Sequence, residues 1–139
     1  MIILDTDVLS ALMKHEPDRA VAAWLDTQSR ISIWTTSVTL LELRFGLEIL
    51  PAGRRRSQLT QAFEILLAEK IAERIAPFDM IAARHAADLM ASRHKRGRPR
   101  ELRDTMIAGI ALAHHATLAT RNTPHFHDLA VPVINPWSP

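Results

Sequence analysis

Short apolar segments alternate with longer stretches of helical periodicity, and this alternation most constrains the fold. We predict strands at residues 2–4, 31–35, 75–78, 116–120 and 131–134. The connections between these strands are mostly too long for hairpins, so they require crossovers that contain helices. Strands that alternate with helices in this way form a parallel sheet covered on both faces. We therefore predict a single domain over residues 1–139, with a three-layer α/β/α fold and a central, mostly parallel sheet of four or five strands.

Helix positions are predicted from apolar residues spaced three or four apart, together with capping and breaking residues. The predicted helices cover 8–13, 17–28, 37–50, 54–73, 79–95 and a last stretch that begins at residue 99 or 100. Pro17 is expected in the first turn of its helix, and Ser37 is expected as an N-cap. Pro77 predicts that the strand before it lies at an edge of the sheet or ends there.

Composition limits the possible functions. Hydrophobic residues make up 47% of the chain, which is enough for a packed core. The absence of cysteine excludes disulfides, thiolate metal sites and cysteine nucleophiles, and it agrees with a cytoplasmic location. No apolar run reaches membrane-spanning length, and no signal-peptide pattern is present. The net charge of +2 permits a polyanionic partner without requiring one.

Four polar residues are predicted to meet at the carboxyl ends of the strands, where sheets of this kind form their ligand-binding crevice. Asp5 directly follows the first strand, and Asn122 lies just past the strand at 116–120. Glu42 and Asp104 each lie early in a helix that is connected to this edge. Both acids share a helical face with apolar residues, so we expect them to point inward. These apolar neighbours are Val38, Leu41, Phe45 and Ile49 for Glu42, and Ile107, Ala108 and Ala111 for Asp104.

Three converging carboxylates would repel one another and raise their pKa values unless a cation neutralises them. Mg²⁺ or Mn²⁺ prefers oxygen ligands and resolves this repulsion. Each residue also has a purely structural interpretation. Asp5 could cap the following turn, and Asn122 could simply form a turn. Glu42 could pair with Arg44 or Arg103. Because all four polar residues fall at one edge of the predicted sheet, we favour a shared site.

Four segments resemble the motifs of PIN-domain nucleases, and in particular VapC-type toxins of bacterial toxin–antitoxin pairs, including the FitB-like branch. The segments are ILDTDVLS at 3–10, TSVTLLELRFG at 36–46, DTMIAG at 104–109 and LATRNT at 118–123. Each motif is weak alone, but their order and spacing cover nearly the whole chain.

The resemblance implies that Asp5, Glu42 and Asp104 are the acidic metal-site residues, with Asn122 as the fourth polar member. Supporting polar roles are implied for Thr6, Asp7 and Thr120. Many relatives carry an acid shortly after the Asn122 position. Here His125 occupies that region and Asp128 comes later, which leaves the second metal position and the roles of these two residues open.

The function implied by the resemblance is a metal-dependent endoribonuclease, the toxin of a type II toxin–antitoxin pair, inhibited by its cognate antitoxin. A metal-bound water or hydroxide would attack an RNA phosphodiester in line. Two alternatives remain open. One is a PIN-fold nuclease that acts on DNA, or processes RNA without an antitoxin. The other is a non-catalytic nucleic-acid or protein-binding module whose acids are structural.

The densest basic run, at 93–100, leads directly to Asp104. It could contact the RNA backbone beside the metal, or it could be a solvated helix end whose cations suit the helix dipole. The RNA-binding candidates are Arg93, Lys95, Arg96, Arg98, Arg100 and Arg103.

The helices at 37–50 and 54–73 carry more apolar residues than one sheet face requires. We therefore expect these helices to supply a homodimer interface or an antitoxin groove. Inhibition is expected to involve an antitoxin arginine, or a lysine, that enters the acidic site among Asp5, Glu42 and Asp104 in place of the metal.

Overall fold

A five-stranded, all-parallel sheet forms the centre of the computed structural model, which describes residues 1–139. The strands are β1 (Ile2–Leu4), β2 (Ile33–Thr36), β3 (Ile75–Ala76), β4 (Thr117–Ala119) and β5 (Val133–Ile134), in the spatial order β3-β2-β1-β4-β5. β1 is the central strand, and its Ile3 pairs with Trp34 on one side and Leu118 on the other. The predicted parallel sheet is confirmed, and β3 is an edge strand, as Pro77 indicated.

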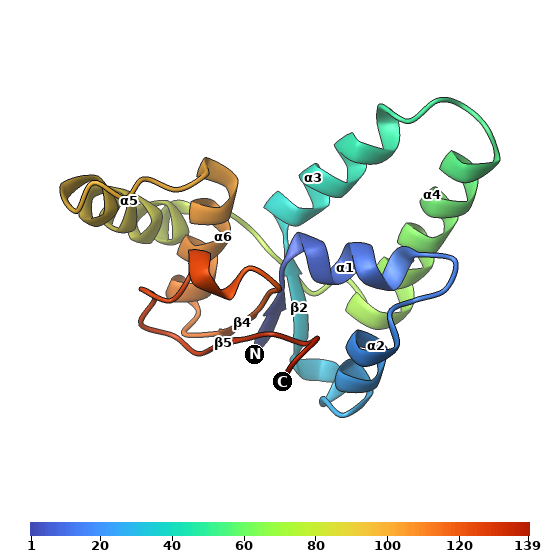
Figure 1. The fold of residues 1–139 in the computed structure, drawn as a ribbon, viewed down its shortest axis with the longest axis horizontal. Coiled ribbons are helices and arrows are strands. Elements are labelled where there is room, and N and C mark those ends of the chain that lie inside the picture. Colours follow the sequence, from blue (N-terminus) through green and yellow to red (C-terminus); the bar gives the residue numbers. More distant parts are fainter.

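Six helices cover the two faces of this sheet. They are α1 (Thr6–Met13), α2 (Arg19–Asp26), α3 (Ser37–Glu48), α4 (Arg54–Leu66), α5 (Met80–Lys95) and α6 (Leu102–Ala113). In Figure 1, α5 and α6 lie on one side of the strands, whereas α1, α2 and α4 lie on the other. None of these helices combines the length and apolarity needed to cross a membrane.

Alternate residues of the central strands supply two separate hydrophobic cores. Ile3 and Leu118 belong to the core beneath α5 and α6, whereas Leu4 and Ala119 belong to the core beneath α1, α2 and α4. This division follows from the two-residue period of a strand, which sends successive side chains to opposite faces. The three-layer arrangement is therefore confirmed.

Several helices begin later or earlier than predicted, and side-chain caps explain the difference. The α2 helix begins after Asp18, whose carboxylate accepts hydrogen bonds from two backbone amides, so Pro17 lies outside the helix. Thr36 caps α3, whereas Ser37 is the first helical residue. Glu101 caps α6, which therefore starts two or three residues later than predicted. In each case the capping side chain satisfies an amide that the helix leaves without a partner.

The stretch predicted as one helix from 54 to 73 ends in two steps. Regular α-helix stops at Leu66, a π-helical segment covers Leu67–Ile71, and Ala72 and Glu73 then adopt left-handed backbone conformations. The left-handed residues stop the helix and turn the chain into β3.

Candidate active site

The carboxyl ends of β1 and β4, the second turn of α3 and the first turn of α6 bring the predicted polar residues into one region. Asp5 follows β1, and its backbone amide donates to the Ala119 carbonyl at 2.9 Å. Glu42 lies in the second turn of α3, and Asp104 lies in the first turn of α6. Burial is the main cause that raises the pKa values of Asp5 and Glu42, and the negative charge of Asp104 adds to the rise in both.

Asp5 is held rigidly at the end of the central strand, with only 4% of its surface exposed. Its Oδ2 accepts from the Thr120 hydroxyl at 2.7 Å, and its Oδ1 accepts from the Thr6 amide at 2.8 Å. Burial, reinforced by the neighbouring Asp7 carboxylate, raises the pKa of Asp5 to about 7. A carboxyl group with this pKa is only partly ionised at neutral pH, and a nearby cation would favour its ionised form.

One of the two carboxylate oxygens of Asp7 lacks a hydrogen-bond partner, which the predicted supporting role does not explain. Its Oδ2 accepts from the Arg121 amide at 3.0 Å. Its Oδ1 is buried and has no hydrogen-bond partner, and it is the single such side-chain atom in the structure. Burial also raises the pKa of Asp7. A buried carboxylate oxygen without a donor is unfavourable unless a water or an ion satisfies it.

Glu42 is half-buried and bound to the first turn of α1. Its Oε1 accepts from the Thr6 hydroxyl at 2.9 Å, and its Oε2 lies 3.8 Å from the Arg103 guanidinium. Arg44 pairs with Glu48 instead. Burial raises the pKa of Glu42, and the charge of Arg103 opposes that rise.

The predicted inward face of α3 is wrong in part. Leu41, Phe45 and Ile49 are 60%, 56% and 66% exposed. The buried residues of this helix are Val38, Thr39, Leu43 and Leu47. An apolar stripe shows that a helix is amphipathic, but which stripe is buried depends on what the helix packs against. Here α3 packs on α1 and α4 through the other stripe, which leaves Glu42 at the margin of an exposed apolar face.

Asp104 occupies the position predicted for it. Ile107, Ala108 and Ala111, which share its helical face, are fully buried. Its backbone amide donates to Glu101 Oε2 at 3.1 Å, and its Oδ2 lies 3.4 Å from Nδ1 of His125. Sequence reasoning did not place Glu101 at the site. The signal for it is an acid three residues before Asp104, at capping distance from an apolar helix.

Thr120 connects Asp5 to the chain after β4. Its hydroxyl donates to Asp5 and accepts from the Asn122 amide at 3.1 Å. The Asn122 side chain is exposed at the same strand end. The backbone of Asn122 thus stabilises the Asp5 carboxylate indirectly, and its amide side chain faces solvent.

Arg93 departs from its predicted role as an RNA contact, because its side chain is only 3% exposed. Its Nε and Nη2 each donate to Asp128 at 2.9 Å, Nη1 donates to Thr105, and Nη2 also donates to the His125 carbonyl. These bonds from Arg93 hold the pKa of Asp128 down at about 2. Asp128 is therefore a structural partner of Arg93, and it is His125 whose ring lies beside Asp104.

The remaining basic candidates lie on the surface. Lys95, Arg96, Arg98, Arg100 and Arg103 are all exposed. Among these residues, Arg103 pairs with Glu101 at 3.1 Å and approaches Glu42, and Arg96 pairs with Asp128.

The acidic site offers carboxylate oxygens as potential metal ligands, and these suit a hard divalent cation. The raised pKa values of Asp5, Asp7 and Glu42 and the unpaired oxygen of Asp7 are what a cation would relieve. As the side chains stand, no three of the His, Asp or Glu residues are grouped to hold one ion. Mg²⁺ retains several waters and commonly uses only one or two direct carboxylates, so these residues fit it.

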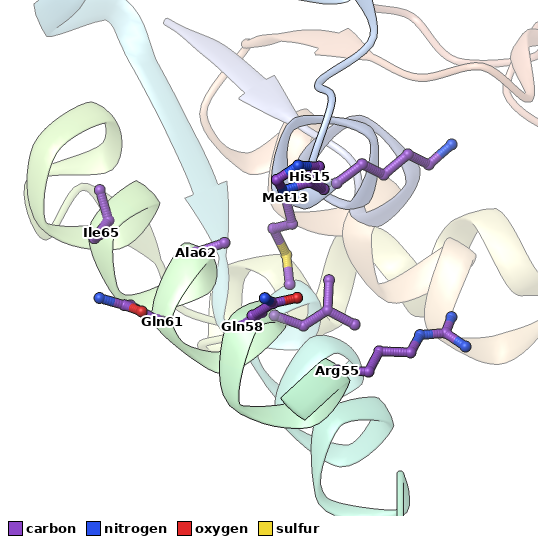
Figure 2. Close-up of a pocket in the computed structure, with 9 residues that line it drawn as sticks. Met13, His15, Arg55, Gln58, Gln61, Ala62 and Ile65 are labelled. Carbon is purple, nitrogen blue, oxygen red and sulfur yellow. The ribbon is translucent and has the colours of Figure 1, made fainter. Parts of the chain in front are cut away.

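A hollow of about 490 Å³ lies between the end of α1 and α4, apart from the acidic site. Figure 2 shows Met13 reaching from α1 toward α4, with Gln58 and Ala62 opposite it. Leu59 and Ile65 add to the apolar lining. Basic groups at the rim come from Lys14, His15 and Arg55. We call this hollow the α1–α4 groove.

Comparison with known proteins agrees with the fold and the motifs. The PIN domain family model matches residues 2–131. The chain is 44% identical over 139 residues to VapC ribonuclease Y4jK of Sinorhizobium fredii, covering 100% of this chain and 99% of that protein. It is 34% identical over 137 residues to Toxin FitB of Neisseria gonorrhoeae, covering 99% of each. A solved structure of FitAB bound to an IR36 DNA fragment matches with a TM-score of 0.88 at 34% identity, covering 99% of this chain and 96% of that one. The chain belongs to the PIN domain family and, within it, to the VapC-type toxins, as the four motifs indicated.

Proposed function

We propose that this protein is a metal-dependent endoribonuclease and the toxin of a toxin–antitoxin pair. The observation that carries the proposal is the acidic site, where three carboxyl groups have raised pKa values and one buried carboxylate oxygen has no partner. Such a site is stabilised by a divalent cation and is unfavourable without one. The names of the relatives Y4jK, a VapC ribonuclease, and FitB, a toxin, support the same assignment.

In this proposal Asp5 and Asp104 hold Mg²⁺ or Mn²⁺, directly or through water. The metal would supply the charge that activates a water and stabilises negative charge developing on an RNA phosphodiester. Thr120 and the Thr6 amide keep the Asp5 carboxylate in one orientation through two hydrogen bonds. Glu42, which the Thr6 hydroxyl holds at Oε1, is assigned to orient the attacking water and accept its hydrogen bond.

The partner is proposed to be an antitoxin that binds the α1–α4 groove. Four of the nine lining residues are apolar and the others are polar or basic, which fits an amphipathic helix that has acidic residues along its edges. Arg103 already brings one cation to within 3.8 Å of Glu42. An antitoxin arginine that paired with the acids more closely would occupy the place of the metal.

The test is a cleavage assay on the purified protein, freed of any partner, with RNA and DNA substrates and added Mg²⁺ or Mn²⁺. We expect RNA cleavage that requires the metal and is lost in Asp5→Asn and Asp104→Asn. Asp88→Asn serves as a matched control, because Asp88 is exposed on α5 and makes no hydrogen bond or ion pair through its side chain. Cleavage of DNA but not RNA would support the DNA nuclease alternative. Full activity in both acidic-site variants would remove the proposed active site.

A further inference from the structure

A hollow of about 450 Å³ lies between the end of α5, the following loop and the turn after β4. All the residues that line it are charged or titratable, and none is apolar. They are Arg93, Arg96, Arg98, Arg100, His127 and Asp128. Four arginines and one aspartate give this arginine hollow a formal charge of +3 with His127 neutral.

The positive charge of the arginine hollow is only partly compensated within the protein. Asp128 accepts both hydrogen bonds of the Arg93 fork, and Arg96 shares one oxygen of the same carboxylate at 3.1 Å. The guanidinium groups of Arg98 and Arg100 have no hydrogen-bond or ion-pair partner in the structure, and both side chains are exposed. Arg93 and Asp128 thus form a neutral framework, and Arg98 and Arg100 are free to bind an anion.

The loop that carries Arg98 is attached to the helix rather than extended into solvent. The Arg98 amide donates to the Arg93 carbonyl at 2.8 Å, and the Gly97 amide donates to the His94 carbonyl at 3.0 Å. Gly97 adopts a left-handed conformation with φ of 65°, which reverses the chain at the end of α5. Arg98 is therefore returned toward the last turn of α5, where Arg93 lies.

Hydrogen bonds of Arg93 link the arginine hollow to the acidic site. Arg93 donates to Thr105, the residue after Asp104, and to the carbonyl of His125. The His125 ring in turn lies 3.4 Å from the Asp104 carboxylate. An RNA strand with its reacting phosphate at Asp104 can therefore continue past His125 into the hollow.

We propose that the arginine hollow binds backbone phosphate of the RNA beside the cleaved linkage, with Arg98 and Arg100 as the contacts. This inference rests on the proposed ribonuclease function and assigns its substrate a second point of attachment. Guanidinium groups match phosphate oxygens with two parallel hydrogen bonds. The core of a protein–protein interface buries apolar and aromatic side chains, and this hollow has none. Phosphate contacts position a nucleic acid without reading its sequence, so Arg98 and Arg100 would affect all RNA substrates alike.

The experiment measures RNA affinity separately from cleavage. Fluorescence anisotropy with a single-stranded RNA of mixed sequence, in EDTA to prevent turnover, is compared for the natural protein and Arg98→Ala/Arg100→Ala. The matched control is Arg19→Ala/Arg84→Ala, which removes two exposed arginines from α2 and α5, outside both sites. We expect the hollow variant to bind RNA about tenfold more weakly than the natural protein. The slope of log affinity against log salt concentration should become shallower by about 0.7 for each RNA phosphate that the variant no longer binds. The control should keep the natural affinity and slope.

A second readout locates the bound phosphate. Neutral methylphosphonate linkages are placed one at a time around the cleavage site that the activity assay maps. The natural protein should bind more weakly to the RNA whose neutral linkage lies at one particular position beside the cleavage site. The affinity of the hollow variant should not change with that substitution, because the arginines that would bind the phosphate are already absent.

Three outcomes would overturn the inference, and they differ from one another. If the natural protein cleaves RNA but the hollow variant keeps its affinity and salt slope, the arginine hollow is not a phosphate site, although the ribonuclease function stands. If the variant keeps RNA binding but is no longer inhibited by the antitoxin, the hollow binds protein instead. If the natural protein neither binds nor cleaves RNA, the proposed function fails as well.

Discussion

Asp5 has a structural role and a proposed chemical role at once. Its carboxylate accepts the Thr6 amide at the start of α1, as the structural alternative required. The same carboxylate is buried among other acids, and its pKa is raised to about 7. Capping needs only an oxygen acceptor, so it does not explain why an ionisable group is kept in this position.

The pKa of Asp5 predicts that the metal-free protein loses stability as the pH rises. Unfolded Asp5 releases its proton near pH 4, whereas the folded protein holds it to about pH 7. The folded state therefore binds more protons across this window, and the free energy of unfolding falls by roughly 4 kcal/mol at most. Burial of Asp7 and Glu42 acts in the same direction.

Urea unfolding at pH 5 and pH 8 in EDTA measures this effect. Asp5→Asn should reduce the difference between the two pH values, whereas Asp88→Asn should leave it unchanged. Added Mg²⁺ should restore stability at pH 8 in the natural protein and much less in Asp5→Asn. Equal pH dependence in the natural protein and Asp5→Asn would contradict the prediction.

The buried fork between Arg93 and Asp128 makes a separate prediction. Asp128→Ala would leave the Arg93 guanidinium buried without its carboxylate, at a cost of about 3–5 kcal/mol in the free energy of unfolding. Arg96→Ala removes only the exposed partner of the same carboxylate and should cost less than about 1 kcal/mol. Chemical denaturation of both variants at pH 7 compares them directly, and similar small losses would show that the fork contributes little.

At the scale of elements, the crossing of α5 and α6 depends on a glycine. A Cβ added at Gly109 would lie 2.6 Å from the Ala82 carbonyl oxygen and 2.8 Å from the Ala86 Cβ. Two helix backbones can approach this closely only where one of them carries no side chain. The close approach positions α6, and with it Asp104, against the sheet.

Two glycine-to-alanine changes in helices should therefore have opposite effects. Gly109→Ala forces α5 and α6 apart, and we expect it to lower the free energy of unfolding by about 1–3 kcal/mol despite the better helix propensity of alanine. Gly46→Ala in α3 has nothing within 4 Å of the added Cβ, so it should raise stability by up to about 1 kcal/mol. Melting temperatures of the two variants give the signs, and stabilisation by Gly109→Ala would show that the helices adjust freely.

At the scale of the whole molecule, the exposed stripe Leu41, Phe45 and Ile49 on α3 is the best candidate for a homodimer surface. We predict that Phe45→Glu shifts the protein toward monomer without lowering the stability of the single chain, because Phe45 is already exposed. Ile31→Glu, at an isolated exposed position before β2, is the control. Light scattering at micromolar concentration measures the assembly state, and a natural protein that is already monomeric would rule the interface out.

The sequence by itself determined the parallel sheet and the edge of that sheet at which the acids lie. These properties follow from local patterns and a general rule. Continuous apolar runs such as 2–4 form buried strands, long connections make them parallel, and parallel strands gather their carboxyl ends at one edge. The inward position of Asp104 was also predictable, since the stripe it shares with Ile107 and Ala108 is buried in the structure.

Only the tertiary structure decided the features that depend on contacts between distant segments. Arg93 looked like one cation in a basic run, but it is buried because Asp128, 35 residues later, folds back against it. The face of α3 that carries Phe45 is exposed because α1 and α4 occupy the other face. The unpaired oxygen of Asp7 arises where the first turn of α1 meets the chain after β4. Periodicity shows that a helix has an apolar side, but burial and pairing depend on which segments the fold brings together.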